Sequence, residues 1–359
     1  HTTVAGVPAR SITKSSNNAF KLKSKIRNIL YHIRIADFRK LREYNHYVFG
    51  KRKLMFLELL SHSWMYGASF ENYYELQFFK KSRTECRQYL TSSLRHELTR
   101  QVNDPCEALV LKDKVRFSEV FEDILGRRVM TFDEIKRQMH DPYSISINEV
   151  VIKPIKGQAG QGIIFPMQNF TSLRQLHDYV ISTVKKPDEY LYEERIIQHS
   201  ALNKLNPSSL NTLRIVTYYD ESINKVDVWS VVLRIEIKAR TDNFATGGIA
   251  ALVDHRGVVC QPAIIKHPSG ERFHIHPVSG EKITGCIIPY YDQAIALAKQ
   301  AAMRIPKVRS IGWDVAITET GPYMLEGNDN WCMTLFQLPG GEGLRHLANS
   351  VCNMFSVYE

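Results

Sequence analysis

Three side chains with oxygen donors stand close together late in the chain: Asp314 in one apolar segment, and Glu326 and Asn328 in the next. Two carboxylates and an amide oxygen are hard ligands of the kind that Mg²⁺ takes while it keeps its other positions for water and substrate phosphates. The same residues would also suit an acidic hairpin tip that is merely solvated. The pattern predicts a divalent metal site if other parts of the chain support one.

Two short strands are needed to bring these donors together. Alternating apolar residues predict strands over residues 313–317 and 322–326, with a Glu-Thr-Gly turn signal between them. A hairpin of this kind places Asp314 beside the two donors of the second strand. The period of two along a strand sends Glu326 and Asn328 to the same face.

A lysine followed by a glycine-rich loop lies near the middle of the chain. Lys153 ends an apolar strand, and residues 157–162 read GQAGQG before another apolar run. Glycines at this spacing permit a turn whose backbone amides can close over phosphate oxygens, although an ordinary hairpin fits as well. The loop is neither a Walker A nor a Rossmann motif, because a strand follows it and no Lys-Ser/Thr pair comes after its last glycine. Lys114 is a second cation from an earlier element, or a simple surface lysine.

Two arginines lie within apolar strands. Arg214 belongs to the segment at residues 211–216, and Arg234 lies on the strand that follows. The guanidinium fork binds phosphate or carboxylate in bidentate fashion, and each charge-assisted hydrogen bond contributes roughly 1.5–3 kcal/mol. Since an unpaired buried guanidinium is costly, a structural salt bridge is the alternative explanation. Asn243 lies in a further loop that contains the pair Gly247-Gly248.

The texture of the chain changes after about residue 105. Residues of about 20–100 have helical periodicity, with little Gly or Pro. Beyond them, short apolar runs are predicted as strands and alternate with helical segments. The expected strands include residues 108–111, 149–152, 163–165, 190–193, 213–219 and 226–233, and the expected helices begin at residues 117, 171 and 292. Strands joined in hairpins and mixed with helices indicate the α+β class.

The net charge of +10 is concentrated early in the chain. Between residues 10 and 53 the only acids are Asp37 and Glu43, and Ile26, Leu30 and Ile33 recur there at helical spacing. A basic amphipathic helix can lie on an anionic membrane surface or hold an acidic partner. It can also pack its apolar stripe on the protein and leave its lysines solvated. No nucleic-acid-binding module accompanies the charge.

The 44% hydrophobic content of the 359 residues is enough for two or three subdomains with cores. No apolar run reaches the about 18 residues of a membrane-spanning helix. Six cysteines without a C-x-x-C pair predict reduced thiols and a cytoplasmic location, with a peripheral position on the inner face of the membrane as an extension.

The blocks described above, in this order and spacing, resemble the ATP-grasp superfamily. The likeness is greatest to sugar-transfer-associated, glutamate-ligase-related ATP-grasp proteins, and weaker to the enzymes that add glutamate to ribosomal protein tails. It covers roughly residues 70–345. It implies two α+β lobes that enclose the nucleotide: a helical basic region over 1–105, an N-lobe with the glycine loop over 106–190, and a C-lobe with the metal site over 191–359.

The resemblance also implies a role for each candidate residue. Lys114 and Lys153 correspond to the lysines that reach the α- and β-phosphates. Arg234 and Asn243 match positions that contact the transferred phosphoryl group, and Arg214 is a further candidate. The loop over the β- and γ-phosphates corresponds to Gly157, Gln158, Ala159, Gly160, Gln161 and Gly162. The hinge that meets the adenine corresponds to Glu194, Arg195, Ile196 and Ile197. The ligands of Mg²⁺, with Mn²⁺ as an alternative, correspond to Asp314, Glu326 and Asn328.

The activity that the resemblance implies is ATP-dependent ligation of a carboxylate to an amine through an acyl phosphate. Such an enzyme needs no covalent nucleophile, and no Ser-His-Asp or Cys-His signature is evident. The alternatives are a kinase-like phosphotransferase and a nucleotide-binding scaffold of a polysaccharide or natural-product assembly complex. The acid and the amine, whether a small molecule, a sugar acid or a peptide, are not identified by the sequence.

Two segments depart from the ribosomal-tail enzymes or are ambiguous. The residues after Asn328 are Asp-Asn-Trp-Cys where those enzymes have a small residue and a proline, so their acceptor site cannot be transferred to this chain. His267, His274 and His276 lie on a Pro/Gly-rich loop. They could suggest a metal or touch substrate, although solvated or structural histidines have the same pattern.

Overall fold

The computed structural model describes residues 14–51, 53–140, 149–156, 162–237, 244 and 247–351, with side chains described from Lys21 onward. It divides into two compact units. One unit combines the residues up to Leu98 with those from Gly343 on, and the other runs from Thr99 to Glu342. The segment after Gly343, which the sequence analysis assigned to the C-lobe, therefore belongs with the N-terminal helices.

The first unit is helical, as the sequence predicts for residues 20–100. Asp37 caps the start of helix α2, because its carboxylate accepts hydrogen bonds from the amides of Arg39 and Lys40. Aromatic side chains such as Phe70, Tyr73 and Tyr74 fill the core. The helices are α1 (Lys14–Ile35), α2 (Phe38–Phe49), α3 (Phe56–Tyr66), α4 (Phe70–Glu75), α5 (Arg83–Cys86) and α13 (Arg345–Val351), and α6 (Ser92–Val102) runs into the second unit.

Helix α13 is tied to the N-terminal part of this unit by backbone contacts. The amide of Arg345 donates to the carbonyl of Gln88 over 3.0 Å, and its guanidinium donates to the carbonyl of Arg87 over 3.2 Å. A Cβ on Gly343 would lie 2.1 Å from the same Gln88 oxygen. Glycine is therefore required where the chain returns to these helices.

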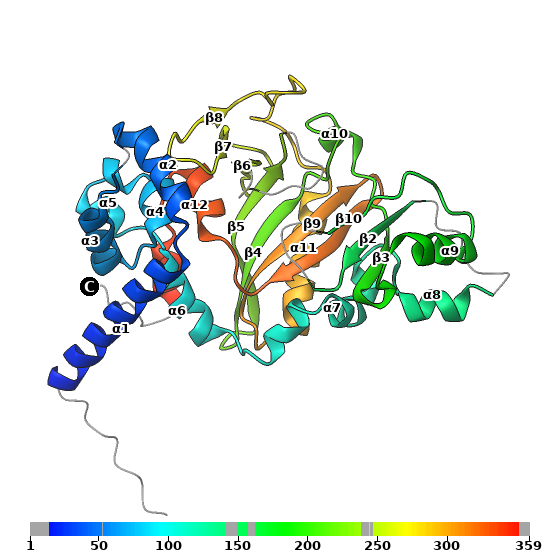
Figure 1. The fold of residues 1–359 in the computed structure, drawn as a ribbon, viewed down its shortest axis with the longest axis horizontal. Helices are drawn as coiled ribbons and strands as arrows, with labels where there is room; N and C mark the ends of the chain where they lie inside the picture. Colours follow the sequence, from blue (N-terminus) through cyan, green and yellow to red (C-terminus); the bar gives the residue numbers. More distant parts are fainter. Residues whose placement is uncertain are drawn as a thin grey trace, which may run out of the picture. The chain divides into compact units, whose positions relative to one another are not determined.

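The second unit contains two antiparallel sheets (Figure 1). The smaller sheet has the order β1-β3-β2 and packs on helices α8 and α9 through apolar residues such as Ile135, Ile152 and Leu176. Ser172 caps α9, which begins two residues after the predicted helix start at residue 171. The elements are β1 (Val129–Thr131), α8 (Phe132–Gln138), β2 (Val150–Pro154), α9 (Leu173–Thr183) and β3 (Tyr190–Glu194).

The larger sheet has seven strands in the order β10-β9-β4-β5-β6-β7-β8. The predicted hairpins at 213–233 and 313–326 are confirmed as β4–β5 and β9–β10. The strands are β4 (Leu213–Asp220), β5 (Lys225–Ile235), β6 (Ile249–Leu252), β7 (Ala263–Ile265), β8 (Arg272–Phe273), β9 (Ser310–Thr318) and β10 (Gly321–Asn328). The other helices of this unit are α7 (Lys114–Val120), α10 (Ser200–Asn203), α11 (Tyr291–Arg304) and α12 (Met333–Gly340).

Alternation along the central strands gives the larger sheet two different faces. Leu213, Ile215 and Val315 belong to one buried cluster with the alanines of α11, which covers this face (Figure 1). Arg214 and Asp314 alternate with these residues and so point to the opposite face. One face of the sheet is therefore an apolar core, and the other carries charged residues.

Two predicted strands are wrong. Residues 108–111 form part of a 3-10 helix (Glu107–Leu111), because the Asp104 carboxylate accepts hydrogen bonds from the amides of Cys106 and Glu107 and starts a helical turn. In residues 163–165, only Ile164 pairs with a strand, through an isolated bridge to Ile152.

No helix among the described residues is long and apolar enough to cross a membrane. The five cysteines in the described part of the chain are free thiols.

Candidate active site

The β9–β10 hairpin brings the three predicted metal ligands together. Asp314 lies directly opposite Glu326 in the strand register, and Asn328 lies opposite Gly312. The Asn328 amide donates to the Glu326 carboxylate over 3.3 Å. All three side chains therefore emerge on the face of the sheet that α11 does not cover.

A β-bulge at Leu325 aims Glu326 at this face. Met324 pairs with Val315 and Glu326 pairs with Asp314, so Leu325 is an extra residue without a partner. Met324 is consequently buried in the apolar core, although regular alternation would send it to the same face as Glu326. The bulge lets one strand supply both a core residue and a site carboxylate.

Asp314 is buried and held by two guanidinium groups. Arg214 donates to both carboxylate oxygens, and Arg234 Nη1 lies 3.0 Å from Asp314 Oδ2. Burial raises the pKa of Asp314, but the charges of Arg214 and Arg234 outweigh it and bring that pKa to about 2. The salt bridge that the sequence analysis left open for these arginines is thus present, and it keeps Asp314 ionised.

Glu326 is in a different electrostatic setting. Half of its side chain is exposed, and the Arg214 guanidinium is 4.0 Å away. Desolvation within the site, followed by the negative charge of Asp314, raises the pKa of Glu326. A cation placed between the two carboxylates would relieve this repulsion.

The smaller sheet and helix α7 each supply a lysine near the predicted metal ligands. Lys153 Nζ lies 2.7 Å from the buried carboxylate of Glu193, and Lys114 Nζ donates to the carbonyl of Pro154 over 2.8 Å. Burial lowers the pKa of Lys114, while the charge of Glu326 raises it and that of Lys153 lowers it. Lys114 therefore lies within electrostatic range of both the other lysine and a predicted metal ligand.

Arg127 connects the two sheets. Its Nε lies 3.0 Å from Glu193 Oε2, and its Nη1 donates over 2.5 Å to the carbonyl of Met324, beside the bulge. Although burial raises the pKa of Glu193, Arg127 and Lys153 lower it to about 2. The sequence analysis placed Glu193 only at the end of a predicted strand, directly before the hinge, and Arg127 was missed because no local pattern marks it.

Two of the four backbone amides of the predicted hinge donate to neighbouring carbonyls, and two do not. The amides of Glu194 and Arg195 donate to the carbonyls of Arg128 and Glu149 over 2.9 and 3.0 Å. The amides of Ile196 and Ile197 have no hydrogen-bond partner among the described residues. Ile196 is buried, whereas Ile197 is 70% exposed. Ile197 is therefore the more accessible of the two to an adenine edge.

Several predicted residues lie outside the described part of the chain: Gly157, Gln158, Ala159, Gly160, Gln161 and Asn243. Gly162, at the end of the loop, has a φ of +73°, and an added Cβ would lie 2.9 Å from Pro154 Cγ. Glycine is required there, directly beside the strand that carries Lys153.

A model of the family described as sugar-transfer associated ATP-grasp matches residues 93–353. The chain belongs to this ATP-grasp family. A search of the curated proteins gives no match.

Solved structures similar to this ATP-grasp chain include three enzymes. D-alanyl-alanine synthetase A from Vibrio cholerae O1 biovar eltor str. N16961 shares 12% identity over 72% of this chain and 68% of its own, with a TM-score of 0.40. A bifunctional glutathione synthetase from Pasteurella multocida shares 15% identity over 65% of this chain and 34% of its own, with a TM-score of 0.35. Biotin carboxylase from Campylobacter jejuni, in a β-γ-ATP complex, shares 12% identity over 70% of this chain and 45% of its own, with a TM-score of 0.36. The chain spans less than half of the last two, and none of these distant similarities assigns it an activity.

The donor set of this ATP-grasp protein suits Mg²⁺. Within the described residues, no three His, Cys, Asp or Glu side chains cluster closely enough to hold a metal. Asp314, Glu326 and Asn328 instead offer two carboxylates and an amide from neighbouring strand positions. Hard oxygen donors in this number match a cation that keeps waters and phosphates as its remaining ligands.

The histidine loop has a structural role at two positions. His276 is buried, its Nε2 lies 3.0 Å from the Glu236 carbonyl oxygen, and its Nδ1 accepts from the Ser279 amide. His267 Nδ1 accepts from the amide of Ser269. The contacts of His276 and His267 are those of loop-stabilising residues.

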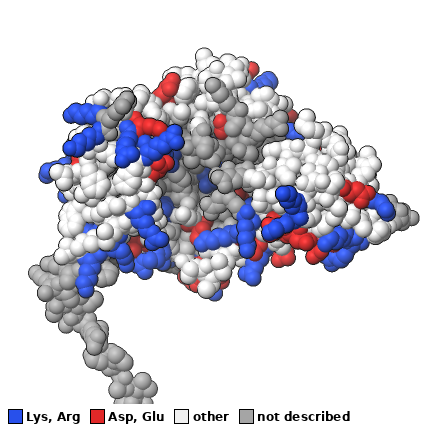
Figure 2. Space-filling model, in the orientation of Figure 1, with Lys and Arg blue, Asp and Glu red and all other residues white. Residues whose placement is uncertain are grey.

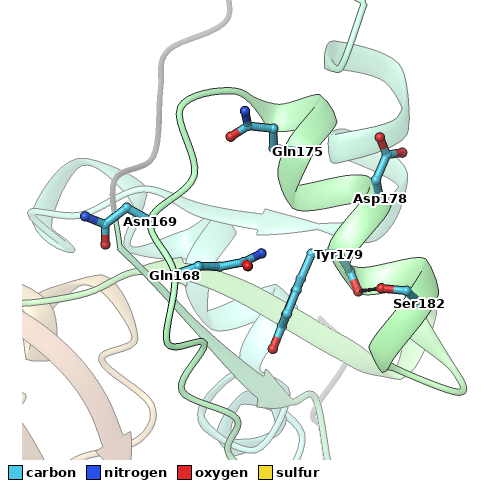
Figure 3. Close-up of a pocket in the computed structure, with 6 residues that line it drawn as sticks. All are labelled: Gln168, Asn169, Gln175, Asp178, Tyr179 and Ser182. Carbon is cyan, nitrogen blue, oxygen red and sulfur yellow. Dashed lines mark hydrogen bonds between the residues drawn. The ribbon is translucent and has the colours of Figure 1, made fainter.

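A polar pocket on α9 lies apart from the candidate site (Figure 3). It is lined by Gln168, Asn169, Gln175, Asp178, Tyr179 and Ser182. The Ser182 hydroxyl donates to the Tyr179 carbonyl over 2.8 Å. None of the predicted site residues lines this pocket, which has no cluster of charges to bind phosphate.

Proposed function

We propose that the chain is an ATP-dependent carboxylate–amine ligase. Family membership supports an ATP-binding enzyme, and the arrangement on the larger sheet supports the reaction type. The observation that carries the proposal is the meeting of two sets of groups: the oxygen donors of the β9–β10 hairpin, and the lysines supplied by the smaller sheet and α7. A triphosphate needs both a divalent cation and fixed positive charges.

The substrate carboxylate attacks the γ-phosphorus of ATP and forms an acyl phosphate, and ADP leaves with the electrons of the broken P–O bond. The amine then attacks the acyl carbon, phosphate leaves, and the surplus amine proton passes to solvent. Mg²⁺ held by Asp314, Glu326 and Asn328 would neutralise charge on the phosphates.

The chain's own residues have separate tasks in this scheme. Lys153 and Lys114 orient the α- and β-phosphates, and the exposed amide of Ile197 meets the adenine. Arg234 lies beside Asp314 and is placed to stabilise negative charge on the transferred phosphoryl group. Arg214, which holds both oxygens of Asp314, orients that carboxylate.

The test is ADP release with panels of acids and amines, followed by mass spectrometry of the product. A ligase forms product and releases phosphate only when acid and amine are both present. Phosphate transfer to a single substrate would indicate a phosphotransferase instead. Glu326→Gln and Lys153→Met are expected to abolish turnover, and Lys186→Met, at a lysine whose side chain is 71% exposed, serves as the matched control.

Nucleotide binding measured by calorimetry separates the enzyme from a scaffold. A scaffold would bind ATP but form no ADP with any pair, and its Glu326→Gln variant would behave as the parent does. That result would overturn the ligase assignment.

A further inference from the structure

Helix α1 packs on the first unit through one face only. The buried His32 ring lies 2.8 Å from Ser63 Oγ and 3.2 Å from Ser93 Oγ. Lys25 Nζ lies 5.3 Å from the centre of the Trp64 ring on α3. These contacts account for one side of the helix and involve none of the residues of the candidate active site.

The opposite side of α1 exposes apolar residues that the packing does not use. Leu22, Ile26 and Leu30 follow one another at intervals of four and are 48, 46 and 61% exposed. Of the apolar stripe that the sequence indicates, Ile33 is thus partly buried, whereas Ile26 and Leu30 face outward. Exposed aliphatic side chains in a row are typical of an interaction surface.

Basic residues lie beside this row. Lys23 and Arg27 occupy the neighbouring row one residue on, and Arg34 continues the first row after Leu30; all three are exposed. Residues 14–35 contain no Asp or Glu. Figure 2 shows basic side chains along this helix. The α1 surface, as we name it, consists of Leu22, Lys23, Ile26, Arg27, Leu30 and Arg34.

We propose that the α1 surface binds an anionic lipid membrane, with the helix lying in the plane of the headgroups. Basic side chains are attracted by the negative surface potential, and aliphatic side chains at their side enter the acyl boundary. Tyr31, also on α1, is 56% exposed, and aromatic rings of this kind favour the headgroup level.

A lipid surface accounts for both components of the α1 surface. A purely acidic protein segment would pair with the three basic residues but would leave the three aliphatic side chains in water. A nucleic acid would likewise engage only the charges. This inference does not depend on the ligase activity, because it uses no residue of the candidate active site.

The experiment is vesicle flotation of the full chain with phosphatidylcholine alone or with about 30 mol% phosphatidylglycerol, at low and high salt. We expect binding to the anionic vesicles only, weakened by salt. The triple variants Lys23→Gln/Arg27→Gln/Arg34→Gln and Leu22→Ser/Ile26→Ser/Leu30→Ser should each bind at least about tenfold more weakly.

Matched controls make the same changes at exposed positions of the second unit. Lys186→Gln/Lys225→Gln/Arg256→Gln removes the same charge, and Ile181→Ser/Ile223→Ser/Ile287→Ser removes similar apolar area. Both controls should bind as the parent does, and circular dichroism should show every variant folded.

Three results would overturn the proposal: no binding of the parent to anionic vesicles, equal binding to neutral ones, or equal weakening by the controls. Capture by poly-glutamate without capture by vesicles would also overturn it and would identify the surface as one for an acidic protein.

Discussion

Arg127 and Glu193 form a buried ion pair, and the Arg127 guanidinium also donates to the carbonyls of Met324 and of Leu325, the bulge residue. Through this one side chain, β3, whose Glu193 also binds Lys153 of β2, is joined to β10, the strand that carries Glu326. The position of Lys153, which we propose to bind phosphate, and that of Glu326, which we propose as a metal ligand, therefore depend on the same contact.

Glu193→Gln should destabilise the second unit by about 3 kcal/mol, because the buried Arg127 and the partly buried Lys153 lose their charged partner. Urea unfolding measures this loss, and Glu189→Gln, in an exposed pair with Lys186, should change stability by less than about 1 kcal/mol. The pKa of Glu193 lies at about 2, below its ordinary value of 4.5. Its contribution is therefore present above pH 4.5 and lost as the pH falls toward 2. Equal effects of the two substitutions would show that the buried pair is not stabilising.

Substitutions at Asp314 and Glu326 should differ in their effect on stability but agree in their effect on metal binding. Asp314→Asn removes the negative charge between Arg214 and Arg234, so the metal-free protein should lose about 3 kcal/mol. Glu326→Gln, at a half-exposed side chain, should change stability by less than about 0.5 kcal/mol. Both variants should lose Mg²⁺-dependent ATP binding by calorimetry. A Glu326→Gln variant that keeps this binding would remove Glu326 from the ligand set.

Deletion of Leu325 should leave Glu326 opposite Asp314, because Met324 and Glu326 would then be consecutive residues that alternate between the core and the site. Affinity for Mg²⁺–ATP should therefore fall by less than about tenfold. Leu325→Ala keeps the extra residue and serves as the control for the loss of the side chain. If the deletion variant folds but binds at least about tenfold more weakly than Leu325→Ala, the bulge itself is needed to orient the carboxylate.

The helical unit should lose stability in mild acid through His32. Burial lowers the pKa of His32 to about 4 from its ordinary 6.5. Since the folded state disfavours the protonated ring, the contribution is complete above pH 6.5 and is lost as the pH falls toward 4, by about 3 kcal/mol at most. Thermal unfolding of the parent and of His32→Gln across this range tests it: the variant should show a smaller decline, and parallel curves would assign the pH dependence to other groups.

Sequence patterns predict those parts of the site that depend on local alternation. The β9–β10 hairpin, the arginines within apolar strands and the helix near residue 171 could be predicted, because a pattern within about ten residues indicates each of them. The bulge at Leu325 has no such mark, since the segment contains no glycine or proline at that position. Contacts between distant residues were equally hidden: Arg127 and Glu193 are 66 residues apart, and the turn that Asp104 starts replaced an expected strand.

The return of residues 343–351 to the N-terminal helices makes the first unit discontinuous in sequence. During synthesis, the carbonyls of Arg87 and Gln88 cannot accept their hydrogen bonds from Arg345 until that residue has been made. The N-terminal helices therefore form before their last partner is present. The unit that carries the α1 surface is therefore completed last. A fragment ending at residue 342 would hold every candidate ligand of the metal and yet lack a piece of its N-terminal half.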